Sequence, residues 1–152
     1  YSVDQGQILP SRSALPDRVL RRIRADVKRR EARLRERMLL RVSFNQINAK
    51  FGPSSRWTEA RKDQEWASYR GKLVRWRGEL REVGTSLGVR YMAVRHLRST
   101  LSMDVQVFLS AEEYKKAAQL PIGSSITYEG YLNTYMGAIA ALTLNEGRLV
   151  GR

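Results

Sequence analysis

The sequence contains no cysteine and a single histidine, His96. Disulfide bonds and thiolate metal sites are therefore excluded, and no cluster of imidazoles can hold a metal ion. The sequence also lacks a long apolar run that could span a membrane, a Gly-x-Ser-x-Gly motif and a phosphate-binding loop. These absences argue against the common catalytic centres. We expect a protein with no catalytic residues, no cofactor and no metal site, and therefore not an enzyme.

Positive charge is what the sequence has in excess. Its 152 residues include 28 Lys and Arg against 15 Asp and Glu, which gives a net charge of +13. Such a balance favours an anionic partner: nucleic acid, an acidic lipid or an acidic protein. A GC-rich genome, or the ion-pair networks of a thermophile, would give the same composition, and these alternatives stay open.

The N-terminal part of the chain predicts an arm and a basic helix. Residues 1–16 are rich in Pro, Gly and Ser and predict an extended arm. Residues 17–41 predict a helix with a narrow apolar stripe at steps of three and four residues: Val19, Leu20, Ile23, Val27, Leu34 and Met38. Eleven basic residues surround this stripe, against four acidic ones. The helix therefore carries +7 of the total charge.

Two shorter helices are predicted between the basic helix and residue 69. Ser43 and Gln46 fit a capping box that would begin a helix over residues 43–50, and Gly52-Pro53 would end it. Thr58 would cap a further helix that runs to about residue 68. We therefore divide the chain into an arm (1–16), a basic helical extension (17–68) and a third domain (69–152).

The third domain begins with a long amphipathic strand over residues 69–83. Val74, Trp76, Gly78 and Leu80 alternate with Arg75, Arg77, Glu79 and Arg81, which is the period of a strand with one buried face. Gly78 interrupts the apolar set, and a glycine inside a strand marks a bend or a close backbone approach.

Further strands are expected over residues 89–96, 103–109, 125–132 and 138–144. The expected turns lie at 84–88 and 133–137, a helix is expected over 110–120, and residues 147–152 could add an edge strand. In the second strand, either Tyr91 and Ala93 or Met92 and Val94 could face inward. Three strands, a helix and two strands are the element order of an OB-fold, a five-stranded Greek-key barrel with an all-β core.

Residues 69–80 carry a family resemblance. The run Tyr69-Arg-Gly-Lys-Leu-Val-Arg-Trp-Arg-Gly78 resembles the Tyr-x-Gly-Lys-x-Val-x-x-x-Gly opening of the bacterial tRNA_anti-like OB domains. Leu120-Pro-Ile-Gly123, Ile126 and Gly130 are similar to the same group, so the resemblance covers about residues 66–145. It implies an OB-fold but no catalytic residue. Many members of the group have no known activity and are attached to membrane or exported segments.

The candidate binding residues lie on the predicted barrel and on the basic helix. OB-folds bind oligomers across strands two and three and the neighbouring loops. There the sequence combines cations for phosphate with rings for base stacking: Arg75, Arg77, Arg90, Tyr91, Arg95, His96, Arg98 and Tyr135. Arg75 and Arg77 could instead solvate the outside of the barrel, and His96 could be an ordinary loop residue. The outer face of the basic helix adds Arg21, Arg22, Arg29, Arg30, Arg33 and Arg37.

Two functions follow, from different classes. In the first, the protein is an OB-fold binding module that recognises a polyanion, with nucleic acid favoured, through the arginine residues and the basic helix. In the second, it is a structural subunit of a larger complex, exported or membrane-associated, whose helix docks on a protein partner or on a second copy. A lipid surface is less favoured, because the apolar stripe is narrow and lacks aromatics. We expect a cytoplasmic protein in the first case, and a periplasmic or extracellular one if a signal peptide was removed.

Overall fold

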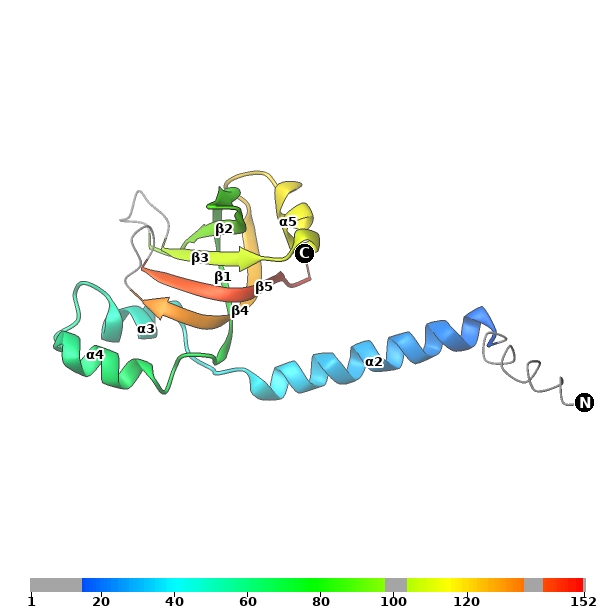
Figure 1. Ribbon diagram of the computed structural model, residues 1–152, viewed down its shortest axis with the longest axis horizontal. Coiled ribbons are helices and arrows are strands. Elements are labelled where there is room, and N and C mark those ends of the chain that lie inside the picture. The colour runs from blue at the N-terminus through cyan, green and yellow to red at the C-terminus, as the bar shows by residue number, and fades with distance from the viewer. Residues whose placement is uncertain (1–14, 98–103, 136–140, 152) are drawn as a thin grey trace, which may run out of the picture. The chain divides into compact units, whose positions relative to one another are not determined.

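The computed structural model describes residues 15–97, 104–135 and 141–151. The chain divides into two compact units, Tyr1–Met38 and Leu39–Arg152. In the first unit, α2 (Asp17–Met38) is a 22-residue helix, and none of its residues is buried (Figure 1). It ends three residues earlier than expected because Leu40 N donates a 2.8 Å hydrogen bond to Leu73 O, so the chain after Met38 runs beside a strand.

The second unit contains a closed five-stranded barrel. Its strands are β1 (Leu73–Ser86), β2 (Val89–Arg95), β3 (Val105–Leu109), β4 (Ser125–Tyr135) and β5 (Leu142–Leu149). They close in the order β1-β2-β3-β5-β4, with β3 and β5 parallel and every other pair antiparallel. The helix α5 (Ala111–Ala118) lies between β3 and β4 in the chain, so the predicted OB-fold is confirmed.

β1 is the strand that joins the two halves of the barrel. Residues 73–79 pair with β4 and residues 79–86 pair with β2, so the change of partner falls at Glu79, directly after Gly78. A Cβ atom at Gly78 would lie 2.6 Å from Val94 Cγ1 and 3.0 Å from Arg95 O. The close backbone approach predicted at this glycine is therefore confirmed.

Several predicted boundaries were wrong. β1 begins at Leu73 rather than at residue 69, because Gly71 adopts a φ of 84° that a strand does not allow. The turn after β1 contains only Leu87 and Gly88, both with positive φ, as two-residue hairpins require. β4 continues to Tyr135, and β5 spans 142–149, so residues 147–149 complete β5 instead of forming a separate edge strand. Part of the hairpin expected at 133–137 lies outside the described residues.

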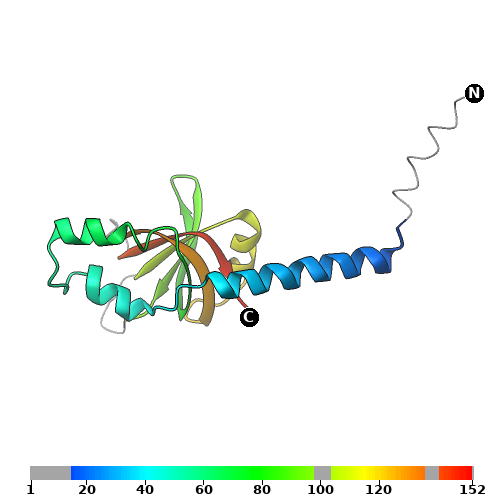
Figure 2. The same ribbon diagram turned by 90° about the horizontal axis from the view of Figure 1, so that it is seen from below.

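Two short helices pack on the barrel within the second unit. They are α3 (Phe44–Phe51) and α4 (Glu59–Trp66), and the predicted capping box of Ser43 and Gln46 begins the first of them. Phe44, Ile47, Phe51 and Trp66 share one core with the inward residues of the strands. In two perpendicular views, α3 and α4 lie at one side of the barrel and α5 at another (Figure 1, Figure 2).

The second strand resolves the alternative that the sequence leaves open. Met92 and Val94 point into the core, while Tyr91 and Ala93 lie on the outer face of β2 and are also buried. Gln106 on β3 and Asp104, directly before that strand, are buried as well. Alternation in this part of the barrel therefore separates inward from outward residues, but not buried from exposed ones.

Candidate nucleic-acid interface

A polar hollow of about 530 Å³ lies where the first turn of α3 meets β1. Its lining comes from residues 42–45, Arg75, Trp76, Arg77 and His96. Trp76 Nε1 donates a 2.7 Å hydrogen bond to Val42 O, which holds the chain before α3 against the strand. Three of the residues predicted from the sequence, Arg75, Arg77 and His96, are thus brought together around one hollow.

Arg75 and Arg77 occupy the outer face of β1, opposite β4. Arg75 donates to Glu129 Oε2 from Nε at 2.9 Å and from Nη2 at 2.7 Å. The Glu129 side chain is only 3% exposed, so this ion pair fixes the guanidinium against the barrel. Arg77 is exposed, and its Nε donates a 2.9 Å hydrogen bond to Ser125 Oγ. Arg77 therefore has the more accessible charge of the two.

His96 is enclosed by aromatic side chains. Its ring stacks on Phe44 with a centroid distance of 4.6 Å, Trp76 meets it edge-on, and its Nε2 lies 2.6 Å from the hydroxyl of Tyr128. Burial lowers the pKa of His96 to about 4, against a smaller opposing effect of Asp104. His96 is therefore neutral at pH 7, and any contact that it makes with phosphate at that pH is a hydrogen bond rather than an ion pair.

The other predicted barrel residues lie apart from this hollow. Arg95 Nη2 pairs with Glu79 Oε1 at 2.6 Å, and exposed Arg90 lies near the β1–β2 turn. Tyr91 donates a 2.8 Å hydrogen bond to Glu82 Oε2; that bond and burial raise the pKa of Tyr91. Arg98 lies outside the described residues.

Tyr135 belongs to an aromatic cluster rather than to the outer surface of β2 and β3. Its ring contacts Phe51 and Trp66, and its hydroxyl donates to a carboxylate oxygen of Asp63 on α4. That hydrogen bond, above all, raises the pKa of Tyr135 to about 12. The residue therefore links the end of β4 to α3 and α4.

The carboxylates that accompany the barrel arginines are not among the residues predicted from the sequence. Glu129 pairs with Arg75, and Glu79 pairs with Arg95 and lies 3.7 Å from Arg81. Period-two alternation already places Glu79 on the same face as Arg75 and Arg77. Glu129 gives no such signal, because its position opposite Arg75 depends on the β1–β4 register.

The six predicted arginine residues of the basic helix are all exposed on α2: Arg21, Arg22, Arg29, Arg30, Arg33 and Arg37. Arg29 donates to Asp26 one turn earlier. The helix carries ten basic residues and four acidic ones, a net charge of +6 within 22 residues. It is therefore a second cationic surface of the protein.

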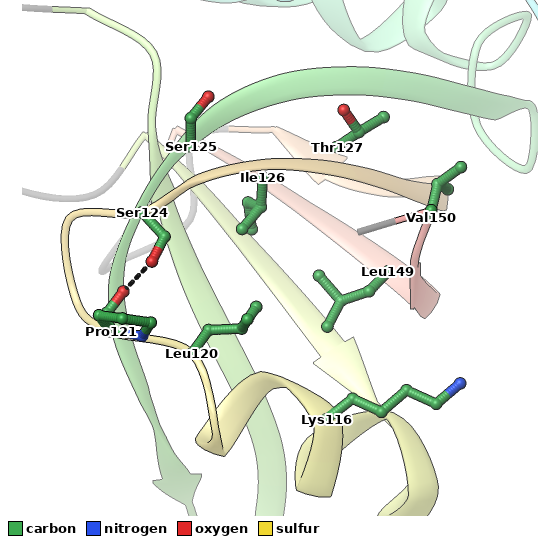
Figure 3. Close-up of a pocket in the computed structure, with 10 residues that line it drawn as sticks. Lys116, Leu120, Pro121, Ser124, Ser125, Ile126, Thr127, Leu149 and Val150 are labelled. Atoms are coloured by element: carbon green, nitrogen blue, oxygen red, sulfur yellow. Dashed lines mark hydrogen bonds between the residues drawn. The ribbon is translucent and has the colours of Figure 1, made fainter.

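Another hollow, of about 510 Å³, lies between α5, the start of β4 and the end of the chain (Figure 3). Its walls include the apolar side chains of Leu120, Ile126 and Leu149, and Ser124 Oγ donates to Pro121 O at its rim. Among the described residues of its lining, Lys116 is the one that carries a charge. Because phosphate recognition needs several converging donors, the hollow beside β1 fits an anion better.

The part of the chain that the structure describes contains neither a candidate metal site nor a membrane-spanning helix. Within those residues, no group of three or more His, Cys, Asp and Glu side chains could hold a metal ion. The helices described there include none that is long and apolar enough to cross a membrane.

The barrel resembles solved structures, although no protein-family model and no curated protein matches the sequence. A proposed nucleic acid-binding lipoprotein from Klebsiella pneumoniae subsp. pneumoniae is 18% identical, with a TM-score of 0.52 over 72% of this chain and 89% of that one. The S. pombe Stn1-Ten1 complex gives 12% identity and a TM-score of 0.38 over 53% of this chain and 59% of that one. Asparaginyl-tRNA synthetase from Pyrococcus horikoshii is 18% identical, with a TM-score of 0.42 over 55% of this chain and 20% of that one. At these identities, the likeness to the lipoprotein shows the fold.

Proposed function

We propose that this protein is a non-enzymatic OB-fold module that binds nucleic acid, with the hollow beside β1 as its phosphate site. The observation that carries the proposal is the convergence of Arg75, Arg77 and the first turn of α3 around one hollow. Guanidinium groups and helix N-termini both bind phosphate well, through paired hydrogen bonds and through free backbone N–H groups. The fold that it shares with a proposed nucleic acid-binding lipoprotein supports the same reading, as does the resemblance to the tRNA_anti-like OB domains.

Arg77 is the residue that we assign the leading role. Its exposed guanidinium can reach a phosphate without giving up an ion pair with a buried carboxylate, whereas Arg75 is held by Glu129. Arg75 then positions the strand and adds charge, and neutral His96 offers at most a hydrogen bond. The basic face of α2 would contribute a less specific attraction that weakens steeply as the salt concentration rises.

The test is a fluorescence-anisotropy titration of single-stranded DNA and RNA oligonucleotides with the full chain at low and moderate salt. Arg77→Ala should lower the affinity about fivefold to tenfold and reduce the salt slope by about one. Lys115→Ala, on α5 and outside the hollow, removes the same charge and should have a much smaller effect. Absence of binding at low salt would refute the proposal. Equal losses of affinity in the two variants would show that the hollow beside β1 is not the phosphate site.

A further inference from the structure

Within the described part of its own unit, residues 15–38, nothing covers the apolar stripe of α2. Ile23, Val27, Leu34 and Met38 are 45–52% exposed, and no residue of the helix is buried. Apolar residues spaced three and four apart form the seam through which helices pair. A 22-residue helix of this composition is only marginally stable alone, because most helical stability comes from packing of the apolar face. We therefore expect the stripe to pack against a partner surface.

The spacing of the stripe defines a seven-residue register. Leu20, Val27 and Leu34 take the first apolar position, and Ile23 takes the second together with two arginines, Arg30 and Arg37. The positions that border the seam carry both signs of charge: Arg24 and Glu31 on one side, Asp26 and Arg33 on the other. These border residues decide which partner the helix accepts.

A parallel pair of α2 helices would be repulsive. In that arrangement each residue of the seam faces its own copy, so Arg30 meets Arg30 and Arg37 meets Arg37. Asp26 would also face Glu31 of the second copy, which brings two carboxylates together on each side. Every charged contact of the parallel arrangement thus involves like charges.

An antiparallel pair reverses each of these contacts. Ile23 then packs against Leu34 of the second copy, while Arg30 meets Val27 and can extend its guanidinium to water. At the borders, Arg24 lies opposite Glu31 of the second copy and Asp26 lies opposite Arg33. By symmetry each of these ion pairs occurs twice. The charge pattern thus fits one orientation and opposes the other.

We propose that α2 pairs in an antiparallel arrangement with α2 of a second copy, and that the protein is a dimer through this helix. A negatively charged surface such as a bilayer fits the same stripe less well, since carboxylates border the seam on both sides, at Asp26 and Glu31. The proposal does not depend on nucleic-acid binding by the barrel.

Charge exchange tests the proposal. Sedimentation equilibrium of the full chain should show a reversible dimer, and Arg24→Glu should raise its dissociation constant about tenfold, because two ion pairs become two repulsions. Arg24→Glu combined with Glu31→Arg restores both pairs and should restore the dimer. Arg18→Glu changes the net charge equally on the opposite side of the helix and should leave dimerisation unchanged. A double variant as weak as Arg24→Glu would contradict the assigned contacts.

Orientation can be tested by cross-linking, since the chain has no cysteine of its own. A mixture of Ile23→Cys and Leu34→Cys proteins should form mixed disulfides, whereas Ile23→Cys alone should form few. Efficient cross-linking of Ile23→Cys alone would refute the antiparallel arrangement. A chain that stays monomeric at every concentration would overturn the proposal, and binding of that monomer to phosphatidylglycerol vesicles would assign the stripe to lipid instead.

Discussion

Arginine has different surroundings in the two units of this protein. On the barrel, Arg75 pairs with buried Glu129 and Arg95 pairs with Glu79, so much of the positive charge is matched by carboxylates and helps to hold the strands. On α2, ten basic residues meet four acidic ones and none of them is buried. The basic residues therefore have different roles in the two units. On the barrel, several arginines form ion pairs that help to hold neighbouring strands together, whereas on α2 the basic residues form an exposed cationic surface.

The largest contrast between the units should appear in stability. Trp76→Ala removes a buried indole that packs against Phe44 and donates to Val42 O, and it should destabilise the barrel by about 3–5 kcal/mol. Leu34→Ala on α2, measured in dilute protein, should cost under about 0.5 kcal/mol. Urea unfolding followed by circular dichroism compares the two variants. Similar losses would mean that the helix is part of the cooperative unit.

Acid should weaken the barrel through His96. Its pKa in the folded protein is about 4, below the ordinary value of 6.5, so the unfolded chain takes up the proton first as the pH falls. The stability contributed by neutral His96 is complete above pH 6.5 and is lost as the pH falls towards 4, by up to about 3 kcal/mol. The free energy of unfolding, measured by urea titration from pH 7 to pH 4.5, checks this.

A matched variant isolates the histidine. His96→Gln retains a hydrogen-bonding group but cannot titrate, so its unfolding free energy should fall less between pH 6.5 and 4.5. α2 contains no histidine, so its own helicity should not follow this titration. Identical pH slopes for the wild type and His96→Gln would assign the acid sensitivity to other groups.

The close approach at Gly78 gives a smaller effect. Gly78→Ala would place a methyl group 2.6 Å from Val94 Cγ1 and 3.0 Å from a carbonyl oxygen, and we expect a loss of about 1–3 kcal/mol. Gly84→Ala on the same strand has its nearest contact at 3.4 Å, from the hydroxyl of Tyr91, and should be nearly neutral. Thermal unfolding compares the pair. Equal losses would show that strand propensity, and not the close approach, sets the cost.

Glu79→Gln should have a smaller effect on stability than Gly78→Ala. This partly exposed carboxylate pairs with Arg95 and lies near Arg81, and exposed ion pairs contribute less than about 1 kcal/mol. If the barrel binds nucleic acid, the variant should bind about two- to threefold more tightly, since one repulsive charge is gone. Glu112→Gln on α5 changes the net charge equally and serves as the control in anisotropy titrations. Equal gains of affinity in the two variants would mean that the net charge of the protein, and not the position of Glu79, causes the effect.

The fold could be predicted because its main signals are local. Alternation around Gly78 predicted β1, and the Ser43–Gln46 capping box predicted where α3 begins. The ends of β5 could not be predicted, since they depend on its pairing with β3 and β4 and not on the residues of β5 alone. Strand order and register are non-local quantities, which one short stretch of sequence does not contain.

The candidate site was less predictable than the fold for the same reason. Arg75 and Arg77 were placed on the outer face by alternation, but Glu129 lies 54 residues after Arg75 in the chain. The sequence predicts His96 either as a phosphate-binding residue or as an ordinary loop residue, and neither prediction includes the enclosure by Phe44, Trp76 and Tyr128. The surroundings of Arg75 and His96 come from residues far away in the sequence, so no local pattern predicts them.

The position of β5 has a consequence for the synthesis of this protein. β5 leaves the ribosome after β3 and β4 but lies between them in space, so the barrel cannot close until β5 has been made. Until then, the edges of β3 and β4 that β5 will cover present unpaired backbone groups, which other chains can pair with. The growing chain is therefore most exposed to aggregation after β4 has been made and before β5 has paired with it.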